Sequence, residues 1–376
     1  MRAKLRRISS ELKNFIKKLI RIKGKHSWTR IEQNEDKRVF DKHKDEWRKL
    51  NRIERKKFRR EKYTYTIFKN LSDEFEQYKD YYVTDKKYLC EIMPRISTEA
   101  HSAAGTPFNT IFNDKNYFER LFPNVKFPKS IVRCINGNYF TENYEPISQE
   151  EVRRILKAYP EVVFKRTVGS QHGAGIKHVS GEQIVEVFEE FGENYIVQEL
   201  IKQHSFLANL NDSSVNVIRV ITVYWKGQSY ILDSRLRIGA PGSFCDHTGF
   251  NGVNPIEIGI SEDGRICGKA FDDTDGLFIP NIFGKKIEGE IPSYQKMLDI
   301  ALRGQAIYPT YGILGWDFTV DEDGNPICIE VNSKFPAIKA AQCVNGPIFM
   351  KNTVNGKLLL DEIMNTPLKL SDQKLV

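Results

Sequence analysis

The hairpin predicted for residues 315–332, GWDFTVDEDGNPICIEVN, constrains the fold of this chain more than any other stretch. Two apolar runs flank a polar turn that contains Asp323-Gly324, a dipeptide typical of β-hairpins. Because side chains alternate along a strand, Glu330 and Asn332 share a polar face, and hairpin pairing can bring Asp317 onto it. Three hard oxygen ligands on one face suit Mg²⁺. The alternative is an ordinary surface hairpin with a solvated acidic face.

The length of 376 residues and the 40% of hydrophobic residues are typical of a globular protein with more than one domain. No apolar run reaches the roughly 18 residues that a membrane-spanning helix needs, and no secretory signal is visible. The six cysteines form no CxxC pair. We therefore expect a cytoplasmic protein with reduced cysteines and no structural zinc.

Basic residues are concentrated in residues 1–62, which hold 24 Lys and Arg against 9 Asp and Glu, whereas the remainder is net acidic. Within this arm, residues 4–23 place apolar side chains at spacings of three and four, with Lys and Arg on the other face. This pattern predicts a helix that lies on an anionic membrane surface, at the inner face of the plasma membrane. A helix packed on the body is the alternative. Nucleic-acid binding is disfavoured because no recognisable module accompanies the charge.

A second informative stretch is EVVFKRTVGSQHGAGIKHVS, residues 161–180. A β-branched run holds Lys165, a glycine-rich loop follows, and a returning strand is predicted from residue 176. Glycines let backbone N–H groups approach phosphate oxygens, and the lysine supplies a counter-charge. The Walker pattern GxxxxGK[ST] is absent. A plain flexible hairpin is the alternative.

The other predicted elements alternate between helices and strands. Helices are expected over 114–123, over 148–157 and 180–191 with a capping box at the start of each, and over 291–309. Strands are expected from Ser130 and over 194–201, 216–225, 229–239 and the end of 249–259. A lone guanidinium in an apolar strand is costly. We therefore expect each of Arg219, Arg235 and Arg237 to face an anion or an acidic partner; a wet strand face is the alternative.

The strand lysine before a glycine loop, a following strand that ends in Glu199, and the late D…ExN hairpin together resemble the ATP-grasp superfamily. The runs 204–222, 235–254 and 314–332 are similar to the sugar-transfer-associated ATP-grasp group of bacterial exopolysaccharide loci. This resemblance covers residues 75–350 and implies an α+β fold whose two lobes grip ATP, with a basic helical N-terminal extension. The implied division is an extension (1–62), an N-terminal part (63–135), a small lobe with the glycine-rich loop (136–201), a large lobe with the metal site (202–365) and a tail (366–376).

The resemblance also implies roles for individual residues. The nucleotide would be held by two phosphate-contacting lysines, a lid loop and an adenine-binding hinge: Lys115, Lys165, Ser170, Gln171, His172, Gly173, Gly175, Glu199 and Ile201. Mg²⁺, with Mn²⁺ as an alternative, would be held by Asp317, Glu330 and Asn332. The catalytic groups near the γ-phosphate would be Arg219, Arg235, Arg237 and Lys165.

The reaction implied is an ADP-forming ligation of a small-molecule acid to an amine, either of them sugar-linked, in cell-surface polysaccharide assembly. The alternatives are a kinase acting on a sugar or alcohol and a non-catalytic, membrane-docked scaffold that binds ATP. Two positions depart from the family pattern. Gly315 stands where many ATP-grasp ligases carry an arginine, and Arg166 stands where a proline is usual. Both departures concern the substrate side more than the nucleotide site.

Overall fold

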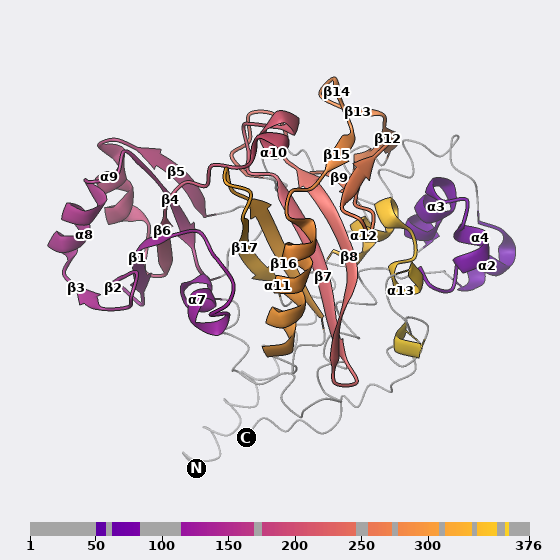
Figure 1. The fold of residues 1–376 in the computed structure, drawn as a ribbon, viewed down its shortest axis with the longest axis horizontal. Helices are drawn as coiled ribbons and strands as arrows, with labels where there is room; N and C mark the ends of the chain where they lie inside the picture. Colours follow the sequence, from indigo (N-terminus) through magenta and orange to yellow (C-terminus); the bar gives the residue numbers. More distant parts are fainter. Residues whose placement is uncertain are drawn as a thin grey trace, which may run out of the picture. The chain divides into compact units, whose positions relative to one another are not determined.

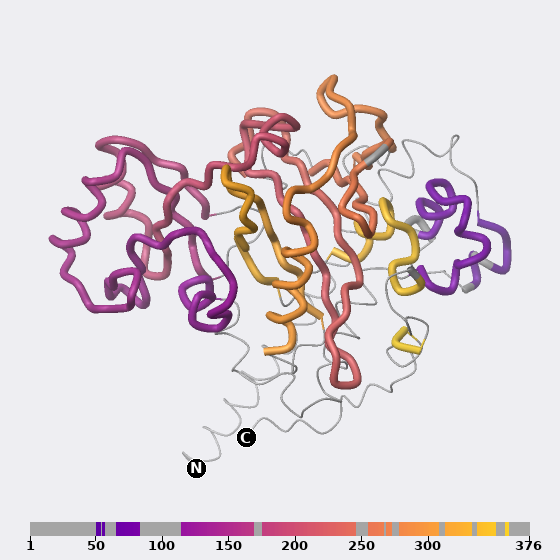
Figure 2. Tube along the Cα trace, in the orientation of Figure 1, coloured from indigo at the N-terminus to yellow at the C-terminus, as the bar shows by residue number. Residues whose placement is uncertain are grey.

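The structure is a computed structural model that describes residues 50–57, 62–82, 114–168, 175–245, 255–272, 277–307, 313–332, 337–351 and 358–360. Figures 1 and 2 show these residues in colour along the chain. The predicted membrane-surface helix over 4–23 and the predicted tail over 366–376 lie outside them. No helix among the described residues combines the length and the apolar composition needed to cross a lipid bilayer.

The chain divides into two compact units, residues 1–77 and 78–376. The described part of the first unit consists of helices α2 (Arg52–Lys57) and α3 (Lys62–Leu71), and α4 (Phe75–Tyr78) lies across the boundary. The ring of Tyr65 packs edge-on against those of Phe68 and Phe75, with centroids 6.2 and 6.4 Å apart. Aromatic contacts of this kind form the small apolar core of this unit.

The second unit contains a six-stranded sheet in the order β3-β2-β1-β6-β4-β5, in which every pair is antiparallel. Its strands are β1 (Ser130–Ile135), β2 (Asn138–Thr141), β3 (Pro146–Ile147), β4 (Glu161–Arg166), β5 (Ile176–Ser180) and β6 (Tyr195–Gln198). The boundary predicted between residues 135 and 136 falls within the β1–β2 hairpin. The predicted division of the chain stays a prediction.

Four short helices accompany this sheet: η3 (Lys115–Tyr117), α7 (Phe118–Leu121), α8 (Gln149–Leu156) and α9 (Gln183–Glu190). The predicted capping box is present in α8, where the hydroxyl of Ser148 accepts from the N–H of Glu151 and the Glu151 carboxylate accepts from the N–H of Ser148. The box predicted at Ser180 is wrong, because α9 begins after Glu182 and has no side-chain cap. Apolar side chains of α8, α9 and the sheet form one buried core.

A seven-stranded antiparallel sheet forms the large lobe in the order β12-β11-β9-β8-β7-β16-β17. Its strands are β7 (Val217–Trp225), β8 (Gln228–Ile238), β9 (Ile256–Gly259), β11 (Ala270–Asp272), β12 (Leu277–Ile279), β16 (Ile313–Val320) and β17 (Pro326–Asn332). Two ribbons pair β10 (Arg265–Cys267) with β15 (Glu288–Glu290) and β13 (Asn281–Ile282) with β14 (Lys285–Lys286). The predicted α+β class is confirmed by this mixture.

Helices pack on both faces of the large sheet. Helix α11 (Tyr294–Ile307) lies along one face (Figure 1), where its apolar side chains join a core with Val220 and Trp316. Helices α12 (Ile338–Asn345) and α13 (Ile348–Lys351) pack on the side of Ile221. The short helix α10 (Ser205–Leu210) precedes β7. Because side chains alternate along a strand, Arg219 lies on the same face as Ile221, which we call the α12 face.

Candidate active site

The β16–β17 hairpin brings its polar residues together as predicted. Asp317 pairs with Glu330 and Gly315 pairs with Asn332, so all four positions lie on one face. A register shift between residues 317 and 318 keeps Glu330 on this face while Cys328 points into the apolar core on the other. The α12 face of this hairpin therefore presents two carboxylates and an amide.

Asp317 is held firmly by its neighbours. Arg219, on the adjacent strand β7, pairs with Asp317 in register and binds its carboxylate with Nε and Nη2, the second contact being 2.8 Å. The Asn332 amide donates to Asp317 Oδ2 at 3.0 Å. The side chains of Arg219 and Asp317 are only 7% and 11% exposed, so this charge-assisted fork is shielded from solvent. Arg219 thereby has the acidic partner that its strand position predicts.

Glu330 faces the two lysines of the small lobe. Its Oε1 lies 2.9 Å from Nζ of Lys115, and these side chains are 32% and 12% exposed. Lys165 is buried in β4, and burial lowers the pKa of its amino group to about 8; nearby Glu330 opposes this shift and Lys115 adds to it. Two amines and two carboxylates therefore meet here, from η3, β4, β16 and β17.

Local structure explains why Lys115 is held at this place. Asp114 caps the 3₁₀ turn by accepting from the N–H of Asn116 at 3.0 Å. The N–H of Lys115 donates to the carbonyl of Thr167 at 3.4 Å. The backbone that carries Lys115 is thus attached to the residue that follows the end of the Lys165 strand.

The predicted adenine hinge follows β6. The Glu199 N–H donates to the Lys129 carbonyl at 2.9 Å, and Oε1 of Glu199 lies 2.7 Å from Nζ of Lys129. Hydrogen bonding to this carboxylate raises the pKa of the exposed Lys129 amine. Ile201 is half-buried. Nearby, Nδ1 of His204 accepts from the N–H of Phe206 at 3.1 Å, so His204 caps the start of α10.

The glycine-rich loop is described only at its end. Ser170, Gln171, His172 and Gly173 lie outside the described residues. Gly175 has a φ of +87°, and a Cβ there would stand 2.8 Å from Cδ of Arg166, so a larger residue would be strained on both counts. The lid role of this loop stays a prediction.

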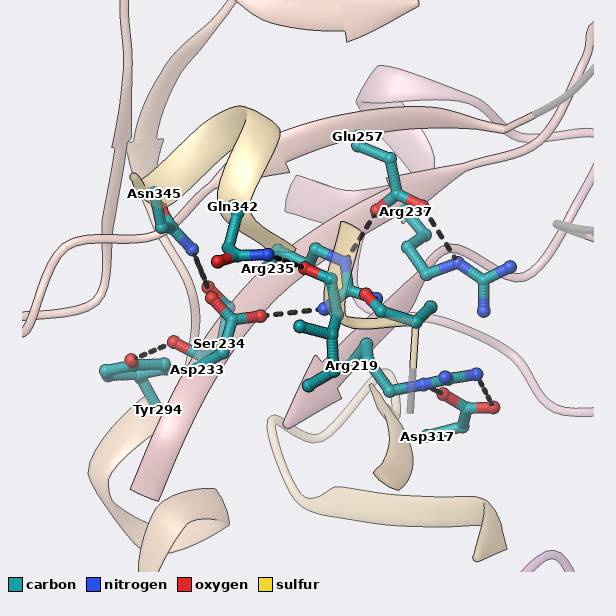
Figure 3. Close-up of polar contacts among 12 residues, drawn as sticks. Arg219, Asp233, Ser234, Arg235, Arg237, Glu257, Tyr294, Asp317, Gln342 and Asn345 are labelled. Atoms are coloured by element: carbon teal, nitrogen blue, oxygen red, sulfur yellow. Dashed lines mark hydrogen bonds and ion pairs between the residues drawn. The ribbon is translucent and has the colours of Figure 1, made fainter. Parts of the chain in front are cut away.

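The remaining two arginines lie in a buried charge network on the α12 face (Figure 3). Arg235 donates to Oδ2 of Asp233 at 2.7 Å, to Oε2 of Glu257 at 3.0 Å and to the Ala337 carbonyl at 3.1 Å. Nε of Arg237 lies 3.5 Å from Oε1 of Glu257. Both arginines thus have the acidic partners that were expected. A direct phosphate contact by either one stays a prediction.

Sequence analysis missed the residues that complete this network. Asp233 and Glu257 both stand within apolar strands, a signal equal to the one that singled out the arginines. Asn345 at the end of α12 donates to Oδ1 of Asp233 at 2.7 Å and to the Ser234 carbonyl at 2.9 Å (Figure 3). A Cβ at Gly259 would collide with this Asn345 side chain, so the glycine leaves room for it. The network ties β8, β9 and α12 together behind Arg219.

Solved structures similar to this chain include a D-alanyl-alanine synthetase A from Vibrio cholerae, 15% identical, with a TM-score of 0.42; the match covers 69% of this chain and 65% of that one. A second is the biotin carboxylase domain of Hydrogenobacter thermophilus 2-oxoglutarate carboxylase, solved with Mg·ADP, ADP and bicarbonate. It is 15% identical, with a TM-score of 0.42, and the match covers 69% of this chain and 47% of that one. An L-amino acid ligase from Bacillus licheniformis is 14% identical, with a TM-score of 0.38, and the match covers 65% of this chain and 46% of that one. The chain thus spans less than two thirds of each relative's length.

No curated protein matches the chain by sequence. The model of one protein family does match, over residues 106–356, which is more than half of the chain. Its span includes Lys115, Lys165, the predicted hinge and the β16–β17 hairpin, and it confirms the resemblance and the ATP-grasp fold predicted from them. The chain belongs to the sugar-transfer associated ATP-grasp family.

Proposed function

We propose that this protein is an ATP- and Mg²⁺-dependent ligase that joins a carboxylic acid to an amine with release of ADP. The observation that carries the proposal is the meeting of Lys115 and Lys165 with Glu330 and Asp317 at one place. Phosphoryl transfer needs positioning and charge neutralisation rather than a protein nucleophile, and this arrangement supplies both. Family membership supports the nucleotide; the family's association with sugar transfer supports a sugar-linked substrate in cell-surface polysaccharide modification.

The donor set fits a divalent cation. Asp317 and Glu330 stand opposite each other on paired strands, and Asn332 adds an amide beside Asp317. Carboxylate and amide oxygens are the ligands that Mg²⁺ prefers, and Mn²⁺ shares this preference. These three residues would hold the ion, whose chemistry is to neutralise phosphate charge and orient the transferred group.

The remaining residues have roles that follow from their places. Lys115 and Lys165 would contact phosphate oxygens, and the loop that holds Ser170, Gln171, His172, Gly173 and Gly175 would close over them. Glu199 and the backbone of Ile201 would border the adenine. Arg219 and Arg237 would face the γ-phosphate or the acylated phosphate, whereas Arg235 is buried among its own partners and would orient this face of the sheet.

In the proposed reaction, a carboxylate oxygen of the acid attacks the γ-phosphorus of ATP, and ADP leaves. An amine then attacks the acyl carbon, an amide bond forms, and inorganic phosphate leaves. The cationic side chains stabilise the negative charge that moves during both steps. No serine, cysteine or histidine nucleophile is required.

Trapping with hydroxylamine tests the reaction. The protein with Mg·ATP, hydroxylamine and a panel of uronic acids and amino acids should release ADP and give a hydroxamate in equal amount. A stable phosphoester without hydroxamate would show a sugar or alcohol kinase instead. Nucleotide binding without any product from the panel would favour the third alternative, a non-catalytic scaffold that binds ATP.

Amide variants test the metal ligands. Asp317→Asn and Glu330→Gln should each lower kcat by about 100-fold or more, because each removes a charge that neutralises the ion. Glu322→Gln makes the same change on an exposed residue in the turn of the same hairpin and should leave kcat unchanged. Folding is checked by circular dichroism. Near-normal turnover in both site variants would contradict the assignment.

The basic N-terminal arm is proposed to hold the enzyme at an anionic membrane surface through residues 4–23. Co-sedimentation with vesicles that contain phosphatidylglycerol, compared with neutral phosphatidylcholine vesicles, tests this. Salt-sensitive binding to the anionic vesicles alone is expected, and its loss when residues 1–30 are deleted. Equal behaviour of the two vesicle types would contradict it.

A further inference from the structure

Asn116 connects the two segments that carry the active-site lysines. It follows Lys115 directly in η3, and its side chain is fully buried. The amide nitrogen donates to Oγ1 of Thr167 at 3.2 Å and to the Cys134 carbonyl at 3.2 Å. Thr167 is itself fully buried and stands two residues after Lys165. One side chain thus links η3 to the end of β4 and to β1.

The backbone of Asn116 is anchored as firmly as its side chain. Its carbonyl accepts from Nη1 of Arg133 at 2.8 Å and from the Tyr144 hydroxyl at 2.5 Å. Arg133 is fully buried and also forms an ion pair with Glu119. A charged donor and a tyrosine hydroxyl on one carbonyl leave this peptide little freedom. The Cα of Lys115 is therefore fixed relative to β1 and β4.

One polar atom of the Asn116 side chain lowers the stability of the folded protein. Among the described residues, no group donates a hydrogen bond to its Oδ1, which is buried. An unpaired buried oxygen costs stability that an apolar side chain of the same size would avoid. The contribution of this side chain therefore lies in the two bonds that its nitrogen donates, one of them to the lysine strand.

We propose that Asn116 and Thr167 are positioning residues that set the separation between the amino groups of Lys115 and Lys165. The proposal rests on the proposed function, in that both lysines contact nucleotide phosphates. A rigid link between the two segments means that the amines are already placed when the nucleotide arrives, so no binding energy is spent on ordering them.

Substitutions at Thr167 test the link. Thr167→Val keeps the shape and removes the hydroxyl, and it should weaken binding of a non-hydrolysable Mg·ATP analogue by about tenfold. Thr167→Ser keeps the hydroxyl and should stay within about twofold of the unsubstituted chain. Asn116→Leu removes the same bond from the other side and should match Thr167→Val. Calorimetry gives the affinities and thermal melting gives the stabilities.

Thr222→Val is the matched control. Thr222 is also fully buried. Its hydroxyl accepts from Nε1 of Trp316 at 2.8 Å and lies 2.7 Å from Oε1 of Gln305, on the face of the large sheet opposite to the α12 face. The Thr222→Val variant should have a lower Tm and an unchanged nucleotide affinity. If Thr167→Val and Asn116→Leu behave like this control, the proposal is overturned.

A double substitution separates positioning from general damage. If Thr167 acts through Lys115, then Thr167→Val should change affinity by less than about twofold when Lys115 is already alanine. An undiminished tenfold loss in that background would overturn the proposal. Failure of the unsubstituted chain to bind the Mg·nucleotide would overturn the proposed function itself, which makes the two failures distinguishable.

Discussion

Replacing Lys165 by methionine should stabilise the protein while abolishing nucleotide binding. The lysine is buried in β4, and no carboxylate among the described residues lies within ion-pair distance of its amine. Burial, with the nearby charge of Lys115 in addition, lowers the pKa of this amine from 10.5 to about 8. Methionine keeps the apolar stem of the side chain and removes the charge that the interior disfavours.

The size and the pH dependence of the effect follow from that pKa. The drop from 10.5 to about 8 corresponds to about 3 kcal/mol of cost for the charged form in the folded state. Below pH 8 both the folded and the unfolded chain carry the proton, so the whole cost is present. Between pH 8 and 10.5 the unfolded chain holds more protons than the folded chain, so stability rises with pH and the cost disappears.

Urea denaturation of both proteins from pH 7 to pH 10 measures this difference. Lys165→Met should exceed the unsubstituted protein by about 3 kcal/mol at pH 7, and the gap should shrink toward pH 10. Lys177→Met, at an exposed position on the neighbouring strand β5, should show no such gap. A less stable Lys165→Met protein at pH 7, or a gap that stays constant to pH 10, would refute the reasoning.

Two further substitutions probe the packing behind the site. A Cβ at Gly304 in α11 would collide with the ring of the fully buried Trp316. Gly304→Ala should therefore lower the free energy of unfolding by about 1–3 kcal/mol in urea denaturation. Arg303→Ala, at the exposed residue before it, should change this free energy little. Arg235→Met leaves Asp233 and Glu257 buried without their shared cation and should cost about 3 kcal/mol; an unchanged midpoint would contradict the importance of this network.

Strands and tight turns could be predicted from the sequence because their signals are local. Lys226-Gly227 marks the turn between β7 and β8, where both residues have positive φ angles of 49° and 85°, as a two-residue hairpin of this kind requires. Gly324, with a φ of 82°, marks the turn of the β16–β17 hairpin in the same way. A dipeptide and its flanking alternation fix such an element without reference to the rest of the chain.

Helix caps and lobe boundaries depend on more distant structure. Ser148 and Ser180 stand in the same sequence pattern, but only Ser148 leads directly into its helix. Ser180 ends β5 in register with Glu161, and the turn at Gly181, with a φ of 60°, separates it from α9. Likewise, β1 joins the same sheet as β4 because it pairs with β6, about 60 residues later. No local signal reports such pairings.

Most partners of the arginines could not be predicted because they depend on strand register. Asp233 shares a strand face with Arg235 by simple alternation along β8, but Asp317 faces Arg219 only because β16 joins β7 in that register. The pairing of Arg237 with Glu257 depends in turn on how β9 joins β8. The position of each arginine in an apolar strand predicted that it has an acidic partner, but the identity of a partner on another strand depends on how the strands pair in the sheet.

Charge balance connects the stability of this site to its proposed chemistry. Lys115 and Arg219 are each paired with a carboxylate, Glu330 and Asp317 respectively, which leaves Lys165 as the cation that these two acids do not neutralise. Burial of this positive charge is what lowers the stability of the free protein, and the charge has the sign that a bound polyphosphate would balance. The cost of Lys165 and its proposed role therefore have one cause. That is why a single substitution is expected to move stability and nucleotide binding in opposite directions.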